Sequence, residues 1–272
     1  MRPSQAADQI SLDGFKAQLE LYDRYIPEKL QGLEEKRLKT IPAALERRRQ
    51  DGDAFLEKEE VQDLVEWKLK HGTYRPKLAS LVASNSASAI RSTTKAAFRI
   101  YADSHDEYGE AVSTLATLKG IGPATASLLL ACADPAAVPF FSDELFRYVH
   151  WESEARGKGW DRKIGYAIKE YRALWTRVQR LRERLAGEEG KGGGLVRAVD
   201  LEKVAYVLGR AAKEVAGRGS EKSGEAVRRL GKEGVERGGD PEEEGEEEEI
   251  RPPPSKRRRR ASSSPPSTSE PA

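Results

Sequence analysis

The sequence predicts an all-α protein. Apolar residues recur at three- and four-residue spacing along most of the chain, Gly and Pro interrupt these runs, and no stretch sustains the alternation of a half-buried strand. Of the 272 residues, the first ~215 are expected to form one or two compact units of ordinary domain size. The expected parts are an N-terminal helical segment (1–53), a helical domain (54–186), a Gly-rich linker (187–194), a C-terminal helix (195–216) and a disordered acidic/basic tail (217–272).

The N-terminal segment contains an amphipathic stretch from about Ser11 to Leu45, with expected breaks at Ile26-Pro27 and Ile41-Pro42. Its apolar residues form either a docking face for a partner or part of the core, and core packing is favoured. These residues are Phe15, Leu19, Leu21 and Tyr22.

The helical domain should contain helices over about 58–70, from Pro76 onward, and through Ala97 and Ile100 after the polar turn Ser84-Asn85-Ser86. Later helices are expected near Tyr108, after Asp143, over about 163–185 and over about 199–212. The segment 67–77 interleaves cations with aromatic residues, a composition suited to phosphate contact and stacking, although a solvated helix end has the same appearance.

A glycine-rich turn is the most informative feature of the chain. In the run Gly120-Ile121-Gly122-Pro123, both glycines can adopt positive φ, Ile121 can point inward as a peg, and Pro123 suits a first helical turn. The free N–H groups at the following helix N-terminus form a ready site for a phosphate. The turn therefore predicts a hairpin of two helices that contacts an anion.

This turn resembles the helix-hairpin-helix motif, which grips the DNA backbone without reading its sequence. Members of the helix-hairpin-helix DNA glycosylase superfamily (HhH-GPD) carry, at about this distance after the hairpin, an aspartate that opens a helix and an arginine four residues later. Asp143 and Arg147 match that spacing, and the resemblance covers roughly residues 54–185. It implies that Arg147 contacts DNA together with the hairpin residues Leu118, Lys119, Gly120, Ile121, Gly122, Pro123, Ala124 and Thr125.

The resemblance implies that Asp143 is catalytic. Base excision rotates the target base into a pocket, and cleavage of the glycosidic bond leaves positive charge on the sugar, which a carboxylate stabilises. A structural alternative is that Asp143 caps its helix, or that Ser142 caps it with Asp143 in the first turn. Ala124 occupies the position of the lysine that strand-cleaving members use, so the resemblance implies a monofunctional enzyme.

Three residues are candidates for contacts with the flipped base. Phe140 and Phe141 immediately precede Asp143 and are candidate pocket walls, although aromatic residues are commonly found in the core. In many members a polar turn such as Ser84-Asn85-Ser86 lies near the residue that fills the space left by the base, so the resemblance makes Asn85 a candidate for it; a plain turn residue is the alternative.

Composition excludes several classes of site. The single Cys132 excludes an internal disulfide and a four-cysteine iron–sulfur cluster, and three scattered histidines indicate no zinc site. No cofactor or metal is expected. No apolar run approaches the ~18 residues of a membrane span, so no membrane contact is expected.

A basic run in the C-terminal tail predicts where in the cell the protein acts. The basic run Lys256, Arg257, Arg258, Arg259 and Arg260 fits a signal read by the nuclear import machinery, or a nonspecific nucleic-acid tether. The sequence thus predicts a nuclear protein that binds duplex DNA. Two functions remain open: a DNA glycosylase for a damaged or mismatched base, or a non-catalytic protein that binds DNA structure through the hairpin.

Overall fold

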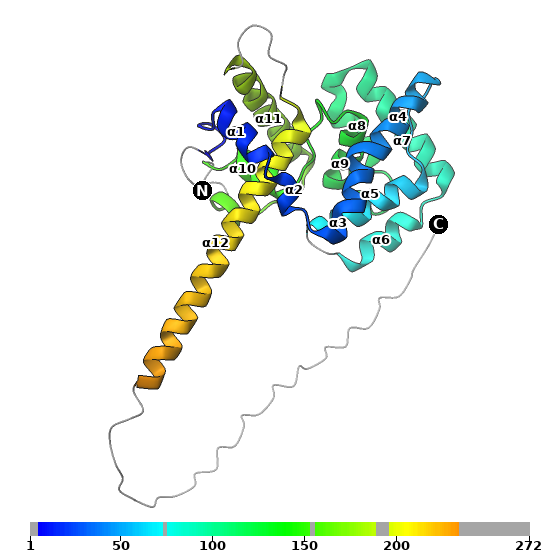
Figure 1. Cartoon of the computed structure of the whole chain (residues 1–272). Helices are drawn as coiled ribbons and strands as arrows, with labels where there is room; N and C mark the ends of the chain where they lie inside the picture. Colours follow the sequence, from blue (N-terminus) through cyan, green and yellow to red (C-terminus); the bar gives the residue numbers. More distant parts are fainter. Residues whose placement is uncertain (1–4, 73–74, 153–155, 189–195, 234–272) are drawn as a thin grey trace, which may run out of the picture. The chain divides into compact units, whose positions relative to one another are not determined.

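All assigned elements in the described residues are helical, which confirms the all-α prediction (Figure 1). The computed structural model describes residues 5–72, 75–152, 156–188 and 196–233. The main helices are α1 (Leu12–Leu19), α2 (Tyr22–Tyr25), α3 (Glu28–Glu35), α4 (Ile41–Gln50), α5 (Lys58–His71), α6 (Pro76–Ala83), α7 (Ala87–Asp103), α8 (Tyr108–Leu115), α9 (Pro123–Ala133), α10 (Asp143–Val149), α11 (Ile168–Glu188) and α12 (Ala198–Glu233). Short connecting turns are η2 (Lys36–Thr40), η3 (His105–Glu107) and η4 (Gly159–Asp161).

Helix α9 lies at the centre of the core. Helices α4, α5, α8 and α11 all contact it. Its sequence, PATASLLLACA, is apolar or small around the whole circumference, and residues 124–130 are buried without interruption. A helix without a polar face is stable in water only when other elements cover it on every side. The hairpin is therefore fixed to a helix that the core encloses.

The N-terminal segment belongs to the same core as the helical domain. Phe15 and Tyr22 are buried, and Leu19 and Leu21 pack against the core, which confirms core packing for this face. The expected break at Pro42 is wrong. The π-helical turn η2 continues directly into α4, where Pro42 occupies the first turn. Its ring and missing N–H are tolerated there because the wider turn does not require the usual hydrogen bond.

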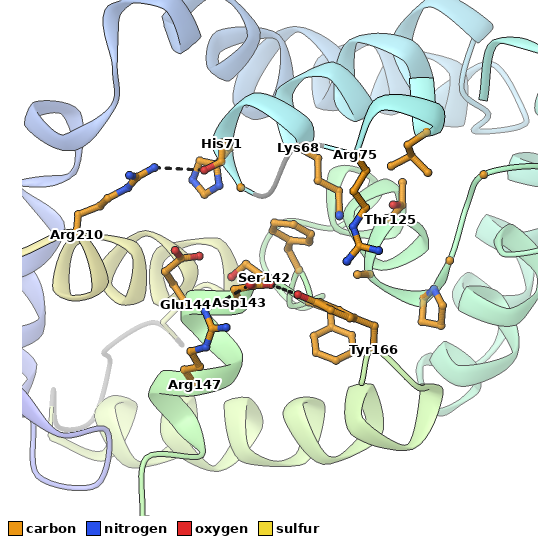
Figure 2. Close-up of a pocket in the computed structure, with 18 of the residues that line it drawn as sticks. Lys68, His71, Arg75, Thr125, Ser142, Asp143, Glu144, Arg147, Tyr166 and Arg210 are labelled. Carbon is orange, nitrogen blue, oxygen red and sulfur yellow. Dashed lines mark hydrogen bonds and ion pairs between the residues drawn. The ribbon is translucent and has the colours of Figure 1, made fainter. Parts of the chain in front are cut away.

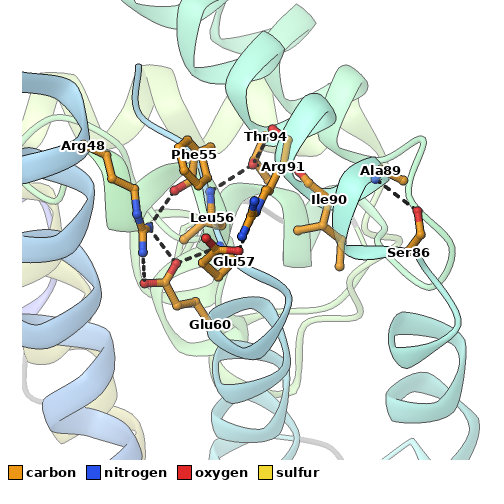
Figure 3. Close-up of polar contacts among 10 residues, drawn as sticks. All are labelled: Arg48, Phe55, Leu56, Glu57, Glu60, Ser86, Ala89, Ile90, Arg91 and Thr94. Atoms are coloured by element: carbon orange, nitrogen blue, oxygen red, sulfur yellow. Dashed lines mark hydrogen bonds and ion pairs between the residues drawn. The ribbon is translucent and has the colours of Figure 1, made fainter. Parts of the chain in front are cut away.

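A polar brace joins α4, α5 and α7 (Figure 3). Arg48 donates to both carboxylate oxygens of Glu60, each at 2.8 Å, and to the Phe55 carbonyl at 2.7 Å. The Glu57 and Glu60 side chains form the capping box that begins α5, and Glu57 also accepts from Arg91 of α7 at 2.7 Å. Satisfying the first N–H groups of α5 in this way fixes where the helix starts.

The first part of helix α12 packs into the unit formed by residues 1–223. Its first N–H groups, from Ala198 and Val199, bond to carbonyls of the turn after α9. Within this unit the segments 1–53, 54–186 and 195–216 share one core. The helix continues to Glu233, beyond the expected end near Ala212, because Ala, Glu, Lys and Arg favour helix despite interspersed glycines. The rest of the predicted tail, 234–272, lies outside the described residues.

No helix among the described residues has the length and apolar character needed to cross a membrane.

Candidate functional site

The turn between α8 and α9 joins two helices, and its two glycines differ in conformation. Gly120 adopts φ +78°, whereas Gly122 has φ −98° and is the N-cap of α9, so the expectation of positive φ holds only for Gly120. A Cβ on Gly120 would lie 2.9 Å from Leu81 Cβ, and one on Gly122 would meet no atom within 4 Å. Ile121 is buried, as expected for a peg. Gly120 is needed for packing, and Gly122 faces open space.

Asn85 braces the hairpin. Its side-chain amide donates to the carbonyls of Val82 and Lys119, each at 2.9 Å, and its oxygen accepts from the Lys119 N–H at 2.9 Å. The side chain is buried, so it does not project as a wedge for DNA. Asn85 is a turn residue that ties the loop between α6 and α7 to the turn before α9.

The start of α10 leaves the Asp143 carboxylate free for another role. Ser142 is the N-cap, and its hydroxyl accepts from the Leu145 N–H at 3.1 Å. The second structural alternative is therefore confirmed: Ser142 caps the helix, and Asp143 lies in its first turn. Its carboxylate points into a cavity instead of back to its own backbone (Figure 2).

Two side chains hold the Asp143 carboxylate (Figure 2). The Tyr166 hydroxyl donates to Oδ1 at 2.7 Å, and Arg147 Nη1 lies 3.4 Å from Oδ2. Arg147 is itself held by a 3.0 Å bond from its Nε to the Arg162 carbonyl. Burial, followed by the hydrogen bond to Asp143, raises the pKa of Tyr166 above its usual value, so this hydroxyl stays protonated as a donor.

The backbone of Tyr166 is unusual. Tyr166 adopts φ +56°, a left-handed conformation that is costly for a residue with a bulky side chain. The guanidinium carbon of Arg75 lies 5.5 Å from the centre of its ring, and the Phe141 ring lies 5.7 Å away. Strained backbone of this kind costs about 1–3 kcal/mol and persists where the surrounding structure enforces it.

A cavity of about 390 Å³ gathers most of the predicted site residues (Figure 2). The volume lies within the range of ligand pockets. Predicted residues that line it are Gly120, Gly122, Pro123, Ala124, Thr125, Phe140, Phe141, Asp143 and Arg147. Leu118 and Ile121 are buried beneath the turn, and Lys119 is exposed on it. The structure thus brings the hairpin, both phenylalanines and the aspartate to one cavity.

The two phenylalanines belong to both the cavity wall and the core. Phe140 is 5% exposed and Phe141 is 1% exposed. Phe140 packs edge-to-face on Trp67, and Phe141 contacts the rings of Phe146, Tyr166 and Tyr171. Because neighbouring rings fix them, only small parts of their surfaces face the cavity.

Cations outnumber carboxylates in the lining. The cationic residues are Lys68, Arg75, Arg147, Arg210 and Lys213, against Asp143 and Glu144. Glu144 turns toward α12, where Lys213 Nζ lies 3.4 Å from its Oε1. The second carboxylate next to Asp143 is thereby paired and directed away from the hairpin. The surplus of cations favours an anionic ligand at the mouth.

His71 supplies a neutral polar edge to the cavity. Its ring stacks between Trp67, at 4.4 Å, and Tyr206, at 4.2 Å. Burial, reinforced by the charges of Arg37 and Arg210, holds the pKa of His71 well below its usual value. Its Nε2 is buried without a hydrogen-bond partner among the described residues. The imidazole is therefore neutral, and its Nε2 is enclosed by the surrounding protein.

A second cavity, of about 590 Å³, is lined by residues of α4, α7 and the end of α9. Its charged groups pair with one another: Asp53 contacts Lys95 and Arg99, and the Tyr101 hydroxyl donates to Asp134. None of the predicted site residues lines it. Within the described part of the chain, no group of three or more His, Cys, Asp or Glu side chains is arranged to hold a metal ion.

Several cavity residues were not predicted individually. Lys68, His71 and Arg75 come from the segment flagged for its cations and aromatic residues, but Tyr166 and Arg210 carried no signal. They lie far from the hairpin in sequence, and only the packing of α5, α12 and the loop before α11 brings them together. Lys256 to Arg260 lie outside the described residues.

Comparison of the chain with models of protein families, with curated proteins and with solved structures finds no match.

Proposed function

We propose that this protein is a DNA N-glycosylase that removes a damaged or mismatched base from duplex DNA. The observation that carries the proposal is the position of Asp143. Its carboxylate lies in the cavity that the hairpin residues Gly120 to Thr125 also line. A backbone-gripping element and a carboxylate at one cavity are what base excision requires.

Each group of side chains in the cavity has one role in the proposed base excision. Departure of the base leaves oxocarbenium-like charge on the sugar, and the Asp143 carboxylate stabilises this charge and orients the attacking water. The Tyr166 hydroxyl, 2.7 Å from Oδ1, fixes the direction of the carboxylate. A base that has left the stack would contact the small exposed parts of Phe140 and Phe141 that line the cavity.

The N-terminus of α9 would receive a phosphate of the DNA backbone. Gly122 leaves open space there, and the helix dipole favours a negative charge. Leu81, an exposed apolar side chain, lies against Gly120 on the same side of the molecule. It is better exposed than Asn85 to enter the space that a flipped base leaves in the duplex.

The test compares binding of duplexes that carry a cationic pyrrolidine abasic analogue, a neutral tetrahydrofuran analogue or no modification. A glycosylase binds the pyrrolidine duplex best because the cation mimics charge formed in the transition state. The Asp143→Asn variant should lose this preference but still bind DNA. Equal, salt-sensitive binding to all three duplexes, unchanged by Asp143→Asn, would leave a non-catalytic DNA-structure-binding protein and reject the enzyme.

We also propose that the protein acts in the nucleus, through recognition of Lys256 to Arg260 by the nuclear import machinery. Replacement of these five residues by Gln or Ala should move a fluorescent fusion out of the nucleus. Unchanged nuclear accumulation would reject the assignment.

A further inference from the structure

Lys68 is an unpaired amine inside the cavity. It lies in the last turn of α5, is half-buried, and points toward the space between Arg75 and Tyr166 (Figure 2). It makes no hydrogen bond or ion pair with any residue that the structure describes. A buried lysine normally has a carboxylate or carbonyl partner, because an unpaired ammonium is costly to remove from water.

Other lysines near the site are differently placed. Lys213 also lines the cavity, but Glu144 pairs with it. Lys70 lies two residues from Lys68 on α5, yet it is exposed and pairs with Glu66 on the outer surface. Lys119 is exposed on the hairpin and does not line the cavity. Lys68 is therefore the amine whose surroundings leave it available for chemistry.

We propose that Lys68 is a nucleophile that forms an imine with the sugar aldehyde of an abasic site and so allows strand cleavage. The inference rests on the proposed function, because it requires an abasic sugar in this cavity. It also departs from the expectation drawn from Ala124, since the amine comes from α5 and not from the hairpin.

The step balances without a further reagent. The Lys68 nitrogen bonds to C1′ of the ring-opened sugar, and the aldehyde oxygen leaves as water, which produces a protonated imine. Loss of a proton from C2′ then breaks the C3′–O bond and releases the phosphate. Asp143, in the same cavity, is available as the acceptor of that proton. Hydrolysis of the imine by water restores the amine.

The electrostatics of the cavity favour the reactive form of the amine. Burial and the nearby Arg75 lower the pKa of Lys68 from its usual value, while Asp143 acts in the opposite direction. A lowered pKa increases the neutral fraction at pH 7, and the neutral amine is the nucleophile. The position of Lys68 in the cavity and its electrostatic surroundings point to the same atom.

The test is borohydride trapping on the full-length protein. Sodium borohydride reduces an imine to a stable amine, so a covalent protein–DNA product reports the bond. The probe is a duplex with an aldehydic abasic site, and the tetrahydrofuran duplex, which has no aldehyde, is the blank. Lys68→Arg keeps the positive charge but cannot form the imine, and Lys70→Arg is the matched control on the outer surface of α5.

Wild type and Lys70→Arg should form the product, and Lys68→Arg should fall to the level of the blank. Peptide mapping of the wild-type product should place the DNA on Lys68, which decides the question even if Lys68→Arg folds poorly. Mapping to another lysine would overturn the inference. Absence of product, with Asp143-dependent preference for the pyrrolidine duplex intact, would overturn it and leave the glycosylase. Loss of that preference as well would reject both.

Discussion

The two hairpin glycines should respond in opposite ways to the same substitution. Gly120→Ser and Gly122→Ser each add the same small polar side chain, at two positions that only Ile121 separates. Gly120 has φ +78° and Gly122 has φ −98°, so only the first requires a left-handed backbone. The pair therefore separates conformational need from contact with DNA.

The contacts set the magnitude of the Gly120→Ser effect. A left-handed conformation costs an ordinary residue about 1–2 kcal/mol. The new Cβ would also lie 2.9 Å from Leu81 Cβ and 3.2 Å from the Val82 nitrogen, atoms that a rotamer change cannot move. Overpacking of this kind adds about 1–3 kcal/mol. We expect a loss of about 2–5 kcal/mol in the free energy of unfolding.

Gly122→Ser should leave stability within about 0.5 kcal/mol of wild type or increase it slightly, because Ser is a preferred N-cap residue. Its Cβ would project into open space at the N-terminus of α9. If a phosphate approaches there, this variant should bind the pyrrolidine duplex more weakly although it folds as well as wild type. Gly122→Ser thus tests binding without a change in fold.

Urea denaturation monitored by circular dichroism gives the free energies of unfolding, and fluorescence anisotropy with labelled duplexes gives the affinities. Equal destabilisation by both substitutions, or none by Gly120→Ser, would refute the conformational argument. Unchanged affinity of Gly122→Ser would show that the phosphate does not approach the hairpin at this residue.

Three further substitutions test the Asn85 hydrogen bonds to the hairpin, the positioning of the Asp143 carboxylate by Tyr166, and the buried His150. Asn85→Asp should lower the free energy of unfolding, measured in urea, by about 1–3 kcal/mol, because a carboxylate oxygen would face the Lys119 and Val82 carbonyls. Wild-type stability of this variant would show that the Asn85 hydrogen bonds do not stabilise the hairpin. Tyr166→Phe should reduce the preference for the pyrrolidine duplex, and an unchanged preference would mean that the hydroxyl does not position Asp143. Burial lowers the pKa of His150 to about 4, so the unfolded chain binds its proton first as the pH falls below the ordinary histidine value. The free energy of unfolding should therefore fall between about pH 6.5 and 4 by up to ~1.4 kcal/mol per pH unit, and His150→Gln should reduce this slope. An identical slope in the variant would contradict the lowered pKa of His150.

Local sequence signals predicted the elements that carry the site. Pro123 begins α9, and Asp143 begins α10, because proline and small polar residues have strong preferences at helix starts. Ile121 is buried as a peg for the same local reason: the turn can bury its apolar side chain only inward. Such features depend on a few neighbouring residues, which the sequence displays directly.

The features that sequence reasoning missed depend on contacts between distant segments. Nothing near Asn85 in sequence indicates that its amide meets the Lys119 backbone, 34 residues away. Tyr166 contacts Asp143, and Lys68 lines the same cavity, only after α5 and the loop before α11 have packed. Gly122 shows a related error, since a glycine permits positive φ but does not require it, and the N-cap of α9 needs an extended backbone.

The two explanations offered for Asp143 from sequence make different demands on its surroundings. A residue kept only to start α10 needs no partner outside the helix, and Ser142 already satisfies the Leu145 N–H. Tyr166 nevertheless adopts a costly left-handed backbone at φ +56° and places its hydroxyl 2.7 Å from the Asp143 carboxylate. Strain of about 1–3 kcal/mol that serves to aim one carboxylate into a cavity is typical of functional sites. The arrangement therefore favours a chemical role for Asp143 over a purely structural one.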